Sequence, residues 1–210
     1  MNAYIKNLIR RFIYRSRTLS RVWHKLYVNR RIRSRTHILL YDSGKLNSIE
    51  IPEGTICDNL IIHFIGDNNN IIIGKNCRFL KTNEIYISGN KNSVIIGSNV
   101  IFDQNVSLVV SEGSKISIGD DCTFANGVRI RTSDQHRIFD STGNRINMAK
   151  NVKIGNHVWL GASVIVMKGV SIGNNTVVGI DSMVTKDLPN SCVAVGKPAR
   201  VIKNDVTWKL

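Results

Sequence analysis

The sequence predicts a mainly β fold, a parallel β-helix, with a basic helical segment at its N-terminal end. Three observations support this prediction. Aliphatic residues recur at every sixth position over most of the chain, small residues often follow them, and the positive charge is concentrated before residue 42. A period of six fits neither an α-helix, which repeats about every 3.6 residues, nor a simple strand, which alternates about every two.

The six-residue repeat is clearest between Ile154 and Val184 and continues toward the N-terminus with short insertions. Its members are Ile73, Phe79, Ile85, Ile96, Phe102, Leu108, Ile118, Phe124, Ile130, Ile154, Leu160, Val166, Ile172, Val178 and Val184. Six extended residues span about 20 Å, and three such sides make a triangular turn whose neighbours pair as parallel strands about 4.8 Å apart. Residues 51–187 then give about seven turns, with the first, more distorted ones in residues 51–95.

Between Ile154 and Val184, glycine follows four of the six repeat residues, at Gly155, Gly161, Gly173 and Gly179. A triangular coil bends sharply at each corner, and glycine and asparagine readily adopt the positive φ that such bends need. We therefore expect the glycines to be corner residues with positive φ.

Residues 1–41 carry eleven Lys or Arg and no acidic residue, whereas the rest of the chain has 18 basic and 15 acidic residues, a net charge of +3. Apolar residues spaced three and four apart predict two basic amphipathic helices here. Their apolar positions are Ile5, Leu8, Ile9, Phe12 and Ile13, then Leu19, Val22, Trp23, Leu26 and Tyr27. We expect three parts: a basic helical segment 1–45, a β-helix domain 46–190 and a tail 191–210.

The helical segment has two possible roles. Its apolar faces could cap the open end of the coil, or its charge could bring residues 1–36 to an anionic membrane or an acidic polymer.

No apolar run is long enough for a membrane-spanning helix, and the N-terminus lacks the pattern of a signal peptide. Four scattered cysteines, without zinc-binding spacing, indicate buried free thiols: Cys57, Cys77, Cys122 and Cys192. Together these features favour a cytoplasmic protein, which would contact the inner face of the membrane through its basic segment if the second of these roles applies.

The stretch RIRTSDQHRIFDSTGNRINMAKNVKIG, residues 129–155, interrupts the repeat. We expect an excursion over residues 132–152 that presents His136. A neutral imidazole, with an ordinary pKa of about 6.5, is suited to accept a proton near neutral pH. Asp134 or Asp140 could orient its other ring nitrogen.

The stretch IGNHVWLGASVIVMKGVSIGNNTVVGIDSMVTKDLPNSCVAVGKPARVIK resembles the C-terminal half of the hexapeptide-repeat acyltransferases. It is most similar to the sugar O-acetyltransferases that act on galactosides, maltose, capsule or O-antigen, and the resemblance covers roughly residues 70–203. It implies a left-handed coil, a homotrimer with each active site between two neighbouring coils, and acetyl-CoA as co-substrate without a metal.

The resemblance also implies roles for individual residues. His136 matches the family's catalytic histidine, a general base for direct attack of a sugar hydroxyl on the thioester. Trp159 lines the site, and the backbone N–H of Gly161 or Ala162 contacts the thioester carbonyl. The acceptor-binding candidates are Asn105, Asp103 and Asp134.

Coenzyme binding is expected in the last turns. The candidates are Gly179, Ile180, Thr185, Lys186, Lys197 and Arg200. The stretch GIDSMVTKD departs from the family, because Ile180 and Asp181 replace two small residues. Aspartate tolerates the left-handed backbone conformation, so the turn survives, but Ile180 narrows the groove for the pantetheine arm.

We therefore expect an O-acetyltransferase that acts on a bacterial surface polysaccharide or its sugar precursor. The basic segment would attract this carbohydrate acceptor if the acceptor is polyanionic. Two alternatives remain, N-acetylation of an amino sugar and a non-catalytic basic scaffold. A metal-dependent carbonic anhydrase needs three histidine ligands, and only His157 lies near His136. The charge lacks the aromatic platform of a nucleic-acid-binding protein, so no nucleic-acid partner is expected.

Overall fold

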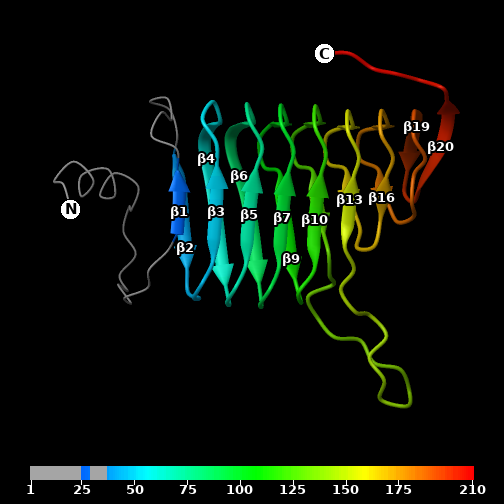
Figure 1. Cartoon of the computed structure of the whole chain (residues 1–210). Coiled ribbons are helices and arrows are strands. Elements are labelled where there is room, and N and C mark those ends of the chain that lie inside the picture. Colours follow the sequence, from blue (N-terminus) through cyan, green and yellow to red (C-terminus); the bar gives the residue numbers. More distant parts are fainter. Residues whose placement is uncertain (1–24, 29–36) are drawn as a thin grey trace.

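The computed structural model describes residues 25–28 and 37–210, and within these residues it contains strands and no helix. The chain winds into a parallel β-helix whose turns stack side by side (Figure 1). The predicted helices over residues 1–24 lie outside the described residues. Lys25–Val28, at the end of the second predicted helix, forms a strand that pairs in parallel with the next turn.

One side of the coil is a seven-stranded sheet in which every neighbour is parallel. Its strands are β1 (Lys25–Val28), β3 (Ser48–Ile51), β5 (Asn70–Ile73), β7 (Ser93–Ile96), β10 (Lys115–Ile118), β13 (Val152–Ile154) and β16 (Ser171–Ile172). We call this the first side.

A second sheet covers the other two sides. In the early turns its strands are long: β2 (Ile38–Asp42), β4 (Ile56–Ile65) and β6 (Arg78–Ser88). Strand β6 pairs with β8 through its first residues and with β9 through its last, so one long strand spans two sides. Later turns divide into a second side, β8 (Ile101–Phe102), β11 (Thr123–Phe124), β14 (Trp159–Leu160) and β17 (Val177–Val178), and a third side, β9 (Ser107–Ser111), β12 (Arg129–Arg131), β15 (Ile165–Val166) and β18 (Met183–Val184).

The C-terminal end departs from the parallel pattern. Strand β19 (Cys192–Gly196) pairs in parallel with β17, and β20 (Ala199–Asn204) turns back to pair with β19 in antiparallel fashion. At the other end, β2 belongs to the coil, so the coil begins before the predicted boundary at residue 46.

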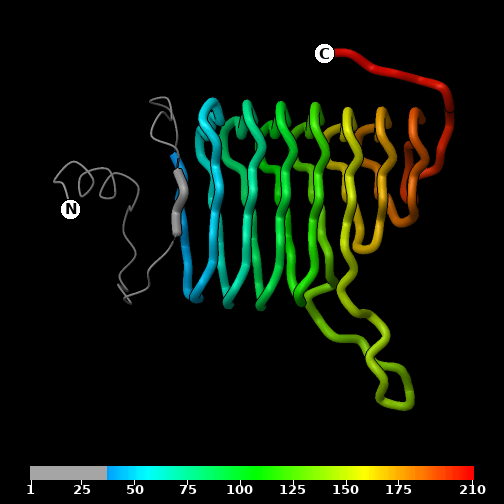
Figure 2. The backbone as a smooth tube through the Cα atoms, viewed as in Figure 1, coloured from blue at the N-terminus to red at the C-terminus, as the bar shows by residue number. Residues whose placement is uncertain are grey.

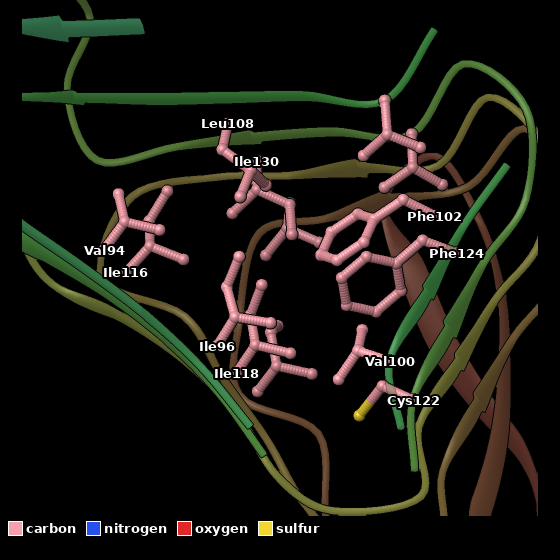
Figure 3. Close-up of a cluster of buried hydrophobic side chains, with 14 of the residues drawn as sticks. Val94, Ile96, Val100, Phe102, Leu108, Ile116, Ile118, Cys122, Phe124 and Ile130 are labelled. Carbon is pink, nitrogen blue, oxygen red and sulfur yellow. The ribbon is translucent and has the colours of Figure 1, made fainter. Parts of the chain in front are cut away.

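The core confirms the six-residue repeat. Every member of the predicted series is buried, with at most 3% of its surface exposed, and the same side chains stack from turn to turn (Figure 3). Phe79 stacks on Phe102, with ring centroids 4.5 Å apart, and Phe102 meets Phe124 edge to face at 5.2 Å. Each such side chain contributes about 1.5–3 kcal/mol on burial, so stacking supplies most of the coil's stability.

The turns are larger in the N-terminal part of the coil than in the C-terminal part. Phe79 pairs with Phe102, 23 residues later, and Phe102 with Phe124, 22 later, whereas Leu160 pairs with Val178, only 18 later. The irregularity predicted for residues 51–95 is therefore a larger turn that repeats regularly. The additional residues lie between the third and first sides.

The predicted role of the corner glycines was wrong. None of Gly155, Gly161, Gly173 and Gly179 has a positive φ. They are needed for close approach instead: a Cβ on Gly155 would lie 2.4 Å from Asn174 Oδ1 in the next turn. Gly155 and Gly173 follow strands of the first side, and the positive φ falls two residues after each of them, at 54° for His157 and 57° for Asn175.

The four cysteines are buried and free, as predicted. Burial raises the pKa of the Cys57 and Cys122 thiols to about 12 and that of Cys77 to about 11. No helix among the described residues is long and apolar enough to cross a membrane.

Candidate active site

The loop that carries His136 leaves the coil after β12, returns at β13 and projects away from the turns (Figure 2). Its outer part is a small hairpin, in which Phe139 bridges Arg145 and the Ile146 N–H donates to the Ile138 carbonyl at 2.9 Å. Asp140 caps the turn of this hairpin by accepting hydrogen bonds from neighbouring N–H and hydroxyl groups, which lowers its pKa. The tip is therefore ordered by its own hydrogen bonds.

A buried polar ladder anchors the base of the loop. Asn47, Asn69 and Asn92 stack inside successive turns, and each amide donates to the one before it at 2.9–3.1 Å. Ser114 continues the ladder: its N–H donates to Asn92 Oδ1 at 3.2 Å, and its hydroxyl donates to Thr132 Oγ1 at 2.7 Å. Each buried polar group left unpaired would cost about 1–3 kcal/mol, so the ladder fixes where the loop begins.

Asn147 holds the loop on both sides of His136. Its amide nitrogen donates to the His136 carbonyl at 2.7 Å and to Asp134 Oδ2 at 2.8 Å, and its amide oxygen accepts from the Ile138 N–H at 2.7 Å. Lys168, from the corner after β15, forms an ion pair with Asp134 and donates to the Asn147 carbonyl at 3.2 Å. The His136 side chain is exposed on this fixed backbone.

The two carboxylates beside His136 are used elsewhere. The hydrogen bond from Lys168, followed by that from Asn147, lowers the pKa of Asp134, and Asp140 serves the hairpin turn. Within residues 37–210, neither carboxylate hydrogen-bonds the His136 ring.

A second ion pair joins the loop to the preceding turn. Arg145 Nη2 lies 2.7 Å from Glu112 Oε1, and this hydrogen bond lowers the pKa of Glu112. Sequence reasoning missed Glu112, Arg145, Asn147 and Lys168, because the repeat carries no signal for contacts between a loop and neighbouring corners.

Several of the remaining predicted residues gather at the corner between the second and third sides. Trp159 is 41% exposed on β14, just before this corner. The Gly161 N–H donates to the Val178 carbonyl at 2.8 Å, so the coil already uses it. The Ala162 N–H has no acceptor among the described residues. Of the two predicted oxyanion donors, only Ala162 is therefore available.

Ala162 occupies the first central position of a tight turn. The Val164 N–H donates to the Gly161 carbonyl at 3.3 Å, and Ser163 has a φ of 58°. This is the pattern of a type II turn, in which the first central residue has the φ of proline.

The next turn places three of the predicted coenzyme residues, Gly179, Ile180 and Lys197, at the same corner. The Asp181 N–H donates to the Ala162 carbonyl at 2.8 Å, and Asp181 has a φ of 59°, which confirms that it tolerates the bend. Ile180 is 73% exposed beside it, and Lys197 Nζ pairs with Asp181 Oδ1 at 2.6 Å.

Four predicted residues lie apart from these clusters. Thr185 and Lys186 are exposed after β18, Arg200 is exposed on β20, and Asp103 is half-buried after β8. Asn105 does lie on the Ala162 corner, with a φ of 57°.

Two corners thus carry the candidate residues within one chain. The loop is fixed at Lys168, and Ala162 lies six residues earlier, at the other end of the third side. Six extended residues span about 20 Å, and the loop projects away from the coil, so one chain keeps His136 and Ala162 apart.

Within the described residues, no group of three or more His, Cys, Asp and Glu side chains could hold a metal ion. Trp208, in the predicted tail 191–210, lies beside Trp159 with ring centroids 5.9 Å apart.

Comparison with known proteins agrees with the fold. The family described as bacterial transferase hexapeptide (six repeats) matches residues 151–186. The polysialic acid O-acetyltransferase of Neisseria meningitidis is 36% identical over 148 residues, which cover 61% of this chain and 69% of that enzyme. The chain belongs to the hexapeptide-repeat acyltransferases.

Two further relatives place this acyltransferase within the family. The polysialic acid O-acetyltransferase of Escherichia coli O1:K1 / APEC is 46% identical over 94 residues, and the match covers 44% of this chain but only 31% of that enzyme. The crystal structure of the polySia-specific acetyltransferase NeuO superposes with a TM-score of 0.80 at 34% identity, covering 90% of this chain and 77% of that one. The resemblance expected from the sequence is confirmed.

Proposed function

We propose that this acyltransferase moves an acetyl group from acetyl-CoA to a hydroxyl of an acidic bacterial surface polysaccharide. One observation carries the proposal: an exposed histidine stands on a loop whose backbone is held from several sides, in a chain related to polysialic acid O-acetyltransferases. A surface histidine without a catalytic role needs no such support.

The reaction needs a base and an oxyanion donor. Neutral His136 takes the proton of the acceptor hydroxyl as its oxygen attacks the thioester carbonyl. The Ala162 N–H donates to the tetrahedral oxyanion, because a fixed backbone donor stabilises charge without reorganising. The intermediate collapses, the carbon–sulfur bond breaks, and the coenzyme A thiolate takes the proton from the His136 imidazolium.

The coenzyme lies toward the C-terminal turns in this proposal. Lys197 and Arg200 carry positive charge for its phosphates, with Thr185 and Lys186 beside the adenine. Gly179 and Ile180 line the path of the pantetheine arm, where the exposed Ile180 side chain offers apolar contact.

The active site is completed by a second copy of the chain in a homotrimer. The separation of the His136 and Ala162 corners supports this arrangement, because a loop from one chain would reach the corner of the next. Four apolar side chains of the loop, each at least 50% exposed, also favour a partner: Ile138, Phe139, Ile146 and Met148. Apolar groups gathered on one loop are typical of a contact between subunits.

The function is tested by measuring thiol release from acetyl-CoA with neutral and acidic glycans as acceptors. We expect release with an oligosialic acid, and O-acetylation of its hydroxyls by mass spectrometry and NMR. Acetylation of an amine on an amino sugar, with no reaction on any hydroxyl, would favour the N-acetyltransferase alternative. No release with any acceptor would contradict the proposed function.

A further inference from the structure

A row of polar residues continues from Ala162 toward the N-terminal turns along the same corner. The Ser163 N–H donates to the Asn126 carbonyl at 2.8 Å, and the Gly127 N–H donates to the Gln104 carbonyl at 3.0 Å. The positions next to Ala162 in successive turns are therefore Asn126 and Gln104.

Lys81 ends this row. Its ammonium donates to the amide oxygen of Gln104 at 2.7 Å, which holds the charge against the corner. The only carboxylate that contacts Lys81 among the described residues is Asp58, which accepts from its backbone N–H at 3.3 Å. The ammonium thus has a fixed position without a carboxylate partner, unlike Lys168 and Lys197, whose charges are paired.

The row of polar residues runs toward the N-terminal turns, which is the side where the acceptor would lie. The coenzyme candidates Ile180 and Lys197 lie on the C-terminal side of Ala162 at this corner, so a polymer acceptor must extend to the N-terminal side. Turns are about 4.8 Å apart, so Lys81 lies three turns, roughly 14 Å, from Ala162. This distance reaches beyond the sugar unit that is acetylated.

We propose that Lys81, positioned by Gln104, is a subsite for the carboxylate of a neighbouring sugar unit in an acidic polymer acceptor. The proposal rests on the proposed function. It implies that this corner of the coil helps to select an acidic acceptor. An ammonium held by a neutral amide keeps its full charge and loses little side-chain freedom when an anion binds.

Lys81→Gln tests the subsite, with Lys91→Gln as a matched control. Both lysines are exposed, lie in neighbouring segments and have a positive φ, 54° and 58°, but Lys91 is at the corner between the third and first sides. We expect Lys81→Gln to raise the KM for a sialic acid oligomer about two- to fivefold, as for a partly exposed ion pair, and Lys91→Gln to leave it unchanged. The same oligomer with its carboxylates reduced to alcohols should show no difference between Lys81→Gln and the wild type.

Gln104→Glu provides a second variant that keeps the lysine. The new carboxylate would neutralise Lys81, so it should raise the KM for the acidic oligomer and leave the KM for acetyl-CoA unchanged. Equal effects on the acidic and reduced oligomers, or equal effects of Lys81→Gln and Lys91→Gln, would overturn the proposal.

Binding of the sialic acid oligomer without acetyl-CoA separates the subsite from the reaction. If the wild type binds the oligomer but transfers no acetyl group, the proposed function fails, and weaker binding by Lys81→Gln than by Lys91→Gln still supports the subsite. Equal binding by both variants would reject it.

Discussion

The indole of Trp208 stacks on the imidazole of His157, with ring centroids 4.3 Å apart and planes 8° from parallel. The Trp208 Nε1–H also donates to the His157 carbonyl at 2.9 Å, and Thr207 Oγ1 donates to Asn175 Oδ1 at 2.9 Å. The tail after β20 therefore returns to the coil, and Trp208 packs against Trp159 on the side of β14.

Trp208→Ala should release the tail and leave Trp159 without its support. We expect faster amide hydrogen exchange at residues 157–160 and a lower rate of acetyl transfer, while the coil itself stays folded because its core lies elsewhere. Lys209→Ala, next along the tail and exposed, is the control. Unchanged exchange and unchanged rate in Trp208→Ala would show that Trp159 is held by the coil alone.

Asn147→Ala should lower kcat at least about tenfold, because it leaves the His136 carbonyl and the Ile138 N–H without their partner. Asn147 acts as a positioning residue, so the KM for acetyl-CoA should change little. Asn144→Ala, in the exposed turn of the same loop, is the matched control and should retain most activity. A fall in kcat that is equal in both variants would point to general loosening of the loop.

Acidification should loosen the loop before it unfolds the coil. The folded pKa values of Asp134 and Glu112 lie below their unfolded values of about 4, because Lys168 and Arg145 hydrogen-bond the ionised carboxylates. Their stabilisation is thus present above about pH 4 and is lost as the pH falls through the lower folded values. Proteolysis with pepsin should cut residues 132–152 first at acidic pH, and Asp134→Asn should make the loop sensitive already at neutral pH to a protease that is active there. Resistance of Asp134→Asn equal to wild type would remove the ion pair from this account.

The cysteines should stay unreactive in the folded protein. The Cys77 and Cys122 thiols lie 3.1 and 3.2 Å from carbonyl oxygens of the next turn, and burial holds their pKa near 11 and 12, so the reactive thiolate is scarce at pH 8. A chromogenic disulfide reagent should modify them only as the coil unfolds in denaturant. Rapid modification in native buffer would indicate that the turns open locally.

The six-residue repeat made the core predictable, because each turn buries side chains at a fixed position and Ile118, Phe124 and Ile130 show that position directly. The break in the repeat likewise predicted the loop that carries His136, which leaves the coil between β12 and β13, whereas the catalytic role of His136 stays a prediction. Contacts between turns were not predictable, because a turn holds 18, 22 or 23 residues and the partner of a corner residue depends on that number. Asp134 and Lys168, 34 residues apart with the loop between them, are an example. The helical pattern over residues 19–27 failed at Lys25–Val28, where pairing with the next turn makes a strand.

The central claim is that His136 of one chain and the Ala162 corner of another form one site. His136→Ala removes the base, and its loss typically costs about 10² to 10⁴ in rate. Ala162→Pro removes the oxyanion donor while suiting the turn, since proline is favoured at this position. Each variant alone should form trimers with little activity.

Co-expression of the two variants, with mixed trimers purified by two different tags, is the most direct test. Every mixed trimer holds two chains of one variant and one of the other, so one of its three interfaces, about a third, joins an intact His136 to an intact Ala162 corner. The account predicts recovery of about that fraction of wild-type activity in the mixed trimers. Mixed trimers no more active than the single variants would show that each site is built within one chain, and would contradict it.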